Sequence, residues 1–425
     1  MSRTAGSFTF LCLLSSVAFA QPAPDGPANA PDAPPTENPP PTDQPLIESE
    51  STLPTPPPAP TEETKAKPNA GFDKGFFLRS DDDKYALKIT GRFQPFFNYS
   101  YVTATKDSKP QFEMRRMRLV LDGHIHGKNL LYKFQADFGK GHPTVKDAHI
   151  DVKLANETWL RFGQWKRPFS RQQINSSGRL EMTDRSITDR AFGAGRDVGI
   201  AIRNDYEKSP EVEWTLGVFN GRGEAPALTG TVTVDPMTGM GTLGSTSTTN
   251  VPSEFRPAVV GRVGYNSKGM KGYSEADLEG GPLRFGAGAS VWLEGDFDDD
   301  AVSSQKVQAD YILKAEGFST TGGVYFMTAQ DGDSILDQAS SLFGFHAQAG
   351  YMLAPKWQAV ARYGYINDVT LKSTTARDQQ EIAVAGNFFG VGHDAKFQGG
   401  MRLIKNGDGK FTDVWLIELG ANVGW

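Results

Sequence analysis

Cysteine is nearly absent from this sequence of 425 residues, in which the single one, Cys12, lies close to the N-terminus. One cysteine excludes a disulfide framework and a cysteine-ligated zinc site. No run of about 20 apolar residues occurs, which excludes a helical protein that crosses a membrane several times. Hydrophobic residues form only 38% of the chain, while glycine is abundant at 46 residues. This composition fits a glycine-rich all-β protein or a large soluble β domain.

A large charge of one sign is lacking as well. The formal net charge is -6, which argues against a dedicated nucleic-acid binder. The G-x-S-x-G motif of a nucleophile elbow is absent and no Ser/His pairing is imposed by spacing, so we do not expect an enzyme. His124 and His126 share one face of a predicted strand, but no third ligand is evident. We therefore expect no metal site and no cofactor.

The N-terminal region predicts an export signal and a linker. Arg3 precedes an apolar stretch that ends in Ala18-Phe19-Ala20, which is typical of a secretory signal peptide over residues 1–20. Residues 21–69 hold 16 of the 27 prolines, with 8 acidic and 2 basic residues. Such a segment cannot bury enough apolar surface to fold, so we expect a disordered periplasmic linker, either a spacer or a leash that reaches a partner. Residues 70–425, with 41 basic and 42 acidic residues, form one long domain.

Alternation with a period of two dominates this domain. In residues 283–294, Phe285, Val291 and Leu293 share one face, while Arg284 and Ser290 share the other. Successive side chains of a strand point to opposite faces, so each such segment has an apolar and a polar face. Sixteen segments follow the pattern: 86–102, 112–124, 130–138, 145–154, 157–166, 197–204, 212–220, 257–266, 283–294, 305–316, 319–328, 341–353, 357–366, 379–389, 393–404 and 413–425.

Two architectures produce this alternation. A soluble sandwich or solenoid buries the apolar face, whereas a transmembrane barrel turns it to lipid and turns the polar face to a watery lumen. Most segments are long enough for a tilted membrane strand of ~9–11 residues, their polar faces carry full charges, and aromatic residues lie near many of their ends. These features favour an all-β fold, a transmembrane antiparallel β-barrel of about 16 strands in the outer membrane of a Gram-negative cell. The last strand ends on Trp425 and resembles the strand that such proteins present to the barrel-insertion machinery.

The charged side chains of the barrel predict a lining for its lumen. A lipid-facing Arg at the membrane midplane costs ~2–4 kcal/mol, so Arg116 and Arg118 are expected to face the lumen, and Arg115 to lie near a rim. Lys133 and Arg161 also fall on polar faces. From charge alone, a wall of mutually paired charges and an anion-selective lumen both remain open.

Residues 167–197 interrupt the series of strands. This stretch carries Arg167, Arg171, Arg179, Arg185, Arg190 and Arg196. It is either an ordinary surface loop or a constriction loop that folds into a wide barrel, where guanidinium groups suit phosphate and carboxylate. The segment 222–256, rich in glycine and threonine, predicts an external loop.

Several motifs in order resemble the phosphate-selective O/P porins of Gram-negative outer membranes. They are MRRMRLVLDG (114–123), FQADFG (134–139), DAHIDVKL (147–154), RFGQWKRPFS (161–170), SSGRLEMTDR (176–185), GRDVGIAIR (195–203), GVFNG (217–221) and GNFFGVGHDAKFQ (386–398). The resemblance implies a 16-stranded, usually trimeric barrel in which basic residues guide phosphate or related anions. It carries the paired arginines of the second strand onto Arg115 and Arg116, followed by Arg118, and the Lys of the GQ-x-K motif onto Lys166.

The sequence thus predicts an outer-membrane channel for passive diffusion of small anions, phosphate or polyphosphate among them. The alternatives are a general non-selective porin, a structural or adhesive outer-membrane barrel without transport, and a soluble β protein. The expected partners are membrane lipid, small anions, two further copies of the chain and the insertion machinery, with no nucleic acid. The expected anion-binding and pore-lining residues are Arg115, Arg116, Arg118, Lys133, Arg161, Lys166, Arg171, Arg179, Arg185 and Arg190.

Overall fold

The computed structural model describes most of the chain from Pro68 onward. The described residues are 68–425 apart from 194, 222, 224–226, 235–236, 238–239, 250, 252–254, 256, 296–302, 331–339, 369–377 and 408–411. The expected signal peptide and nearly all of the expected linker lie outside the described residues, so both stay predictions.

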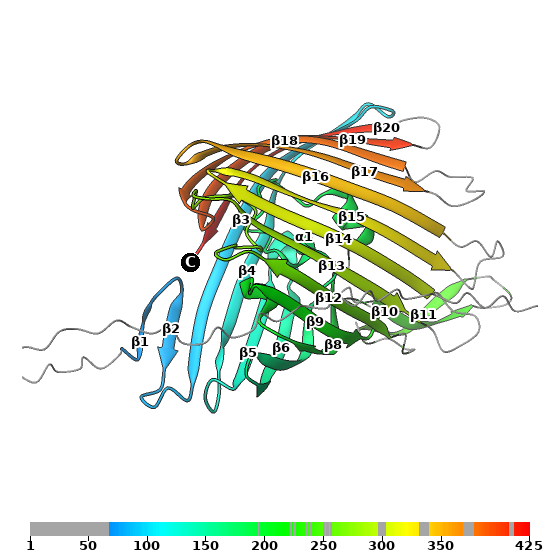
Figure 1. The fold of residues 1–425 in the computed structure, drawn as a ribbon. Coiled ribbons are helices and arrows are strands. Elements are labelled where there is room, and N and C mark those ends of the chain that lie inside the picture. The colour runs from blue at the N-terminus through cyan, green and yellow to red at the C-terminus, as the bar shows by residue number, and fades with distance from the viewer. Residues whose placement is uncertain are drawn as a thin grey trace, which may run out of the picture. The chain divides into compact units, whose positions relative to one another are not determined.

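The described residues form a closed antiparallel barrel of 16 strands (Figure 1). In chain order its strands are β3 (Ala86–Val102), β4 (Asp107–His124), β5 (Leu130–Asp137), β6 (Thr144–Ala155), β7 (Thr158–Lys166), β8 (Arg196–Arg203), β9 (Val212–Phe219), β12 (Ala258–Asn266), β13 (Arg284–Glu294), β14 (Ser303–Ala315), β15 (Phe318–Gln330), β16 (Ser340–Ala354), β17 (Trp357–Asp368), β18 (Asp378–Val391), β19 (Ala395–Gly407) and β20 (Thr412–Gly424). Every strand pairs with its neighbours along the chain, and β20 pairs with β3 to close the ring. All sixteen predicted segments correspond to these strands, and the predicted barrel is confirmed.

Alternation along the strands gives the barrel two unlike surfaces. On β13, Phe285, Val291 and Leu293 are exposed on the outside, whereas Ser290 and Trp292 are buried. The same outward apolar pattern runs through the other barrel strands and fits a wall surrounded by lipid. None of the described helices is long and apolar enough to cross a membrane.

The first and last barrel strands, β3 and β20, meet where the barrel closes. The backbones of Gly91 and Trp425 exchange two hydrogen bonds of 3.1 and 3.2 Å, and the Trp425 ring packs against Phe93. Below this point a hairpin of β1 (Ala70–Phe72) and β2 (Phe76–Arg79) pairs with the first residues of β3 and continues the line of β20. We call this end of the barrel the terminal end and the opposite end the loop end.

Several further structured pieces were not predicted. Inside the stretch 167–197 lie α1 (Arg171–Ile174) and α2 (Ile187–Phe192), and inside 222–256 lies a separate hairpin of β10 (Ala227–Val234) and β11 (Gly241–Thr249). Short 3-10 turns occupy Gly139–Gly141 and Tyr206–Lys208. The two helices leave no helical period in the sequence because α1 and α2, at four and six residues, are too short to show one.

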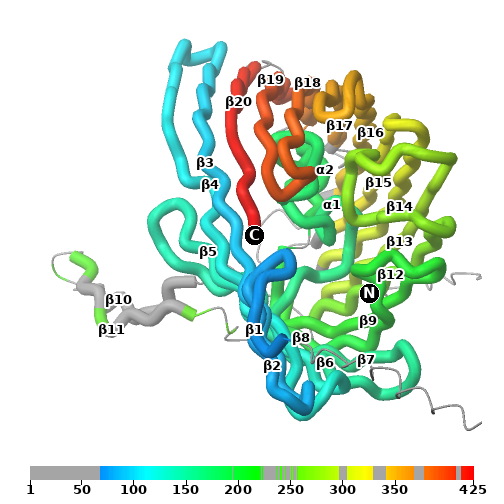
Figure 2. Tube along the Cα trace, turned by 90° about the vertical axis from the view of Figure 1, so that its left-hand side faces the viewer, coloured from blue at the N-terminus to red at the C-terminus, as the bar shows by residue number. Residues whose placement is uncertain are grey.

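Two connections fold into the lumen. Figure 2 shows α1 and α2 inside the ring of strands. They belong to residues 167–195, between β7 and β8, which we call the constriction segment. The second connection, residues 267–283 between β12 and β13, enters from the terminal end, and we call it the inner segment. Its Tyr273, Glu275 and Asp277 are buried.

Candidate functional site

The constriction segment contains two capped helices, α1 near its start and α2 near its end. The Ser170 hydroxyl accepts a hydrogen bond from the Gln173 backbone, and the Ser186 hydroxyl accepts one from the Asp189 backbone. These are N-caps, which satisfy amides that a short helix leaves unpaired. A serine followed three residues later by Gln or Asp is the signal in the sequence that could have located both helices.

Apolar side chains hold the segment against one half of the lumen. Phe169 and Phe192 are fully buried in a cluster with Trp292 and Tyr325, and Leu180 and Met182 are also buried. Burying each such side chain contributes about 1.5–3 kcal/mol relative to exposure. The segment thereby fills the half of the lumen that β12–β20 enclose, which we call the filled half.

Polar contacts fix the tip of the segment to the same half. Arg362 donates to the carbonyls of Asp184 (2.8 Å) and Arg185 (3.2 Å), and Asn387 donates to that of Glu181 at 2.8 Å. The Thr183 hydroxyl donates to Glu418 at 2.6 Å. The open space is consequently left between the segment and the lumen side of β3–β8, which we call the basic half.

Three adjoining cavities occupy this space. The outer one, of about 740 Å³, is lined by ten Lys and Arg residues and four carboxylates. An inner cavity of about 240 Å³ has six Lys and Arg residues and two carboxylates. A third cavity, of about 400 Å³ near the terminal end, is lined by five Lys and Arg residues and one carboxylate. Arg118 lines all three cavities, and Arg179 lines the inner and the third cavity. The basic lining therefore continues from one cavity to the next.

A β-bulge turns two consecutive arginines into the outer cavity. Gln94 pairs with Arg116 and Pro95 pairs with Met114, which leaves Arg115 as the extra residue on β4. A bulge re-aims side chains, so Arg115 and Arg116 both face the lumen. The expectation that Arg115 lies near a rim was wrong because strict alternation fails at the bulge.

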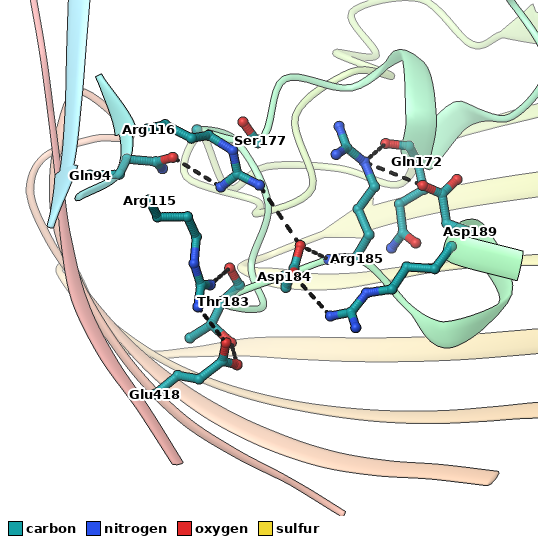
Figure 3. Close-up of polar contacts among 12 residues, drawn as sticks. Gln94, Arg115, Arg116, Gln172, Ser177, Thr183, Asp184, Arg185, Asp189 and Glu418 are labelled. Atoms are coloured by element: carbon teal, nitrogen blue, oxygen red, sulfur yellow. Dashed lines mark hydrogen bonds and ion pairs between the residues drawn. The ribbon is translucent and has the colours of Figure 1, made fainter. Parts of the chain in front are cut away.

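The two arginines differ in how far their charges are offset (Figure 3). Arg115 lies 2.7 Å from both Glu113 and Glu418 and stacks on the Phe96 ring. Arg116 instead donates to the neutral Gln94 at 3.1 Å, and its nearest carboxylate, Asp184, is 3.9 Å away. The Arg190 and Arg116 guanidinium groups hold the pKa of Asp184 well below its ordinary value despite burial.

Most of the other predicted site residues line these cavities. Arg118 pairs with Asp137 at 2.8 Å, Lys133 with Asp147 at 3.5 Å, and Arg190 with Asp184 at 2.8 Å. Lys166 donates to the carbonyls of Ile174 and Asn175.

Arg185, in the constriction segment, lies 3.4 Å from Asp189. Arg179 is exposed, and no described carboxylate lies within ion-pair distance of it.

Two predicted residues have a different environment. Arg161 lines the inner cavity, but its guanidinium contacts Asp151 at 2.7 and 3.0 Å and Glu207 at 3.0 Å. Arg171 lines none of the three cavities: it is buried and pairs with Asp310 at 2.9 Å. Both hold elements of the structure together, which no period in the sequence could indicate.

Arg92 on β3 is a lining residue that sequence reasoning missed. It donates to the Ser176 and Ser177 hydroxyls at 3.0 and 2.9 Å, and within the described part of the chain no carboxylate forms an ion pair with it. The signal was available, because Lys88, Thr90 and Arg92 share the polar face of their strand. Lys74, Lys88, Lys109, Lys140, Lys146, Arg196 and Arg402 also line the cavities.

Comparisons with known proteins place the barrel among porins. The family model described as phosphate-selective porin O and P matches residues 87–398. The outer membrane channel DcaP of Acinetobacter baumannii has a similar structure, with TM-score 0.56 and 14% identity over 82% of this chain and 99% of that one. In-vitro folded OmpT of Vibrio cholerae, in its trimer form, has TM-score 0.51 and 11% identity over 81% of this chain and 100% of that one. At these identities the structural likeness shows the fold alone, and no curated protein sequence matches the chain.

Proposed function

This chain belongs to the phosphate-selective porin O and P family of outer-membrane channels, and we propose that its pore conducts small anions, phosphate or polyphosphate among them, in preference to cations. The observation that carries the proposal is the excess of fixed positive charge along the open space. Ten basic residues against four carboxylates line the outer cavity, although the barrel domain as a whole is nearly neutral.

The distribution of carboxylates explains how a neutral domain supports a positive path. In the filled half, arginines and carboxylates pair directly: Arg262 with Asp310 at 2.7 Å, and Arg362 with Glu381 at 2.8 Å. Those charges cancel locally. In the basic half, three cations along the cavities form no ion pair with a carboxylate among the residues that the structure describes: Arg92, Lys166 and Arg179. A net positive field therefore remains along this path.

The chemistry of the lining favours oxyanions over chloride. Guanidinium groups present several N–H donors in a plane, which can meet two oxygens of one phosphate or carboxylate. A single chloride ion cannot use that geometry. Arg116, Arg118 and Arg185, on two sides of the outer cavity, are the donors expected to contact a passing oxyanion.

Planar-bilayer recordings of the purified protein test the proposal. A reversal potential across a potassium chloride gradient should show anion preference, and added phosphate should block the chloride current. A pore that prefers potassium, or that is indifferent to phosphate, would leave a general porin. No discrete conductance steps from folded protein would favour the structural or adhesive barrel.

We further propose that the terminal end faces the periplasm and that the chain assembles as a homotrimer. The trimer form of the structurally similar OmpT supports the second point. Light scattering in mild detergent, corrected for bound detergent, should give three times the chain mass. A monomeric mass would contradict it.

A further inference from the structure

The inner segment touches the constriction segment deep inside the lumen. Glu275 of the inner segment donates its backbone N–H to the Arg179 carbonyl at 3.2 Å, and its carboxylate accepts the Glu181 backbone N–H at 2.8 Å. The inner segment is itself anchored, because Asp277 accepts from Arg284 and from the Gly317 backbone, and Tyr273 donates to Glu213 at 2.9 Å. A fixed support therefore lies beneath the tip of the constriction segment.

The same contact brings two buried carboxylates together. The Gln348 side-chain amide donates to Glu181 Oε2 at 2.8 Å and to Glu275 Oε2 at 3.0 Å. Glu181 also accepts from Ser319 and Gln358. Two carboxylates that share one donor away from water are not both ionised without a large cost. A proton on one of them relieves the repulsion.

The groups that face this pair come from several strands. Ser319, Gln348, Gln358 and Asn387 are neutral. Among the described residues, Lys314 and Lys396 interact electrostatically with Glu181, and the Lys396 ammonium donates to the Leu180 carbonyl at 2.6 Å. Arg362 also approaches, because it donates to the Gln348 side-chain oxygen at 3.4 Å. Lys396 offsets part of the negative charge, but burial, reinforced by Glu275, still raises the pKa of Glu181 from 4.5 to about 7.

We propose that Glu275 is a positioning residue for the constriction segment and that its contact with Glu181 makes the open state of the pore depend on pH. When the tip is docked, Glu181 retains its proton; when the tip is released into water, Glu181 loses it. A released tip moves toward the basic half, where the ion path lies, and reduces the current.

The sign of the pH effect follows from proton linkage. Docking takes up a proton wherever the docked carboxyl is protonated and the released one is not, which is the window from about 4.5 to about 7. The docked state is fully favoured below that window and loses its advantage as pH rises through it. The docking constant falls by up to about tenfold for each pH unit. Closures should therefore become more frequent between pH 5 and pH 8.

Bilayer recordings at pH 5, 6, 7 and 8 test this on the full chain. Wild-type closures should increase with a midpoint near 7, and Glu181→Gln, which cannot ionise, should show the low closure frequency of pH 5 at every pH. Glu275→Gln removes the neighbouring charge and should move the midpoint to lower pH. Glu211→Gln is the control, because Glu211 is an exposed carboxylate in the turn before β9, and it should keep the wild-type profile.

The inference concerns the opening of the pore and rests on the proposed channel function. It does not depend on anion preference, so it would still hold for a non-selective pore. It is wrong if wild-type closures do not change between pH 5 and pH 8, or if Glu181→Gln keeps the wild-type profile. Hydrogen exchange in detergent at pH 8 gives a second readout that requires no bilayer. Peptides covering residues 178–185 should exchange faster in the wild type than in Glu181→Gln, and equal rates would also contradict the proposal.

Discussion

Arg115 and Arg116 are neighbours in the chain, and both point into the outer cavity because one of them is the extra residue of a β-bulge. Their charges nevertheless act differently. Arg115 is offset by Glu113 and Glu418, each 2.7 Å away, whereas Arg116 contacts a neutral glutamine and a more distant Asp184. Arg115 therefore stabilises the barrel wall, whereas Arg116 contributes to the positive electrostatic potential along the ion path.

Arg116→Gln should reduce anion preference without unfolding the barrel. The substitution removes a unit charge whose nearest carboxylate, Asp184, is 3.9 Å away and pairs more closely with Arg190. For an ion that passes at ~7 Å in an effective dielectric of ~40, one charge stabilises an anion and destabilises a cation by ~1 kcal/mol each, so the anion-to-cation permeability ratio should fall by roughly 30-fold. The reversal potential in a salt gradient measures the change.

A matched control for this measurement is Lys128→Gln. Lys128 is an exposed cation in a turn at the terminal end, pairs with Asp83 and lines none of the three cavities. It should leave the reversal potential unchanged. Equal losses from both variants would mean that overall charge, rather than the lining, decides the preference.

Arg171→Ala should loosen the constriction segment. Arg171 joins the start of the segment to Asp310 and to the Gly272 carbonyl of the inner segment. Breaking a buried ion pair costs about 3–5 kcal/mol, and the remaining Arg262–Asp310 pair at 2.7 Å places this loss near the lower end. Single-channel currents should become noisier, with frequent substates, while the barrel still migrates as folded protein on unheated gels. A quiet, wild-type current would show that Arg171 is dispensable for docking.

The strands were predictable because the two faces of each strand meet different environments. Lipid on one side and a polar lumen on the other impose period-two alternation, so the predicted 130–138 and 357–366 differ from β5 and β17 by two residues or fewer at each end. Several strands extend further toward the loop end than predicted. β15, for example, reaches Gln330 rather than residue 328, because polar residues near the loops no longer alternate clearly.

The site was less predictable because charge pairing depends on three dimensions. Alternation placed Arg118 and Lys133 on the lumen side, but it could not show that Arg161 and Arg171 are engaged by carboxylates on other elements. It also misplaced Arg115, since a bulge is a local exception to the period. Arg92, by contrast, lies on the polar face that alternation along residues 86–102 defines, together with Lys88 and Thr90.

Gly91→Ala should weaken the closure of the barrel. A Cβ at Gly91 would lie 2.2 Å from the Trp425 ring, so the ring must move from the seam where β20 meets β3. Overpacking of this kind costs about 1–3 kcal/mol. The folded band on unheated gels should disappear at a lower temperature than in the wild type. At Gly386 the nearest atom is 4.0 Å away, so Gly386→Ala should melt like the wild type.

Arg179→Gln should weaken anion preference most at low salt. Arg179 is exposed and lines both the inner and the third cavity, and its removal disturbs no ion pair among the described residues. An exposed charge is screened over a Debye length of ~30 Å at 0.01 M salt but only ~3 Å at 1 M. The reversal potential of the variant should therefore differ from that of the wild type in dilute potassium chloride and converge with it in concentrated solution. A difference that persists at 1 M would place Arg179 in direct contact with the permeating ion, because only a contact within a few ångströms escapes that screening.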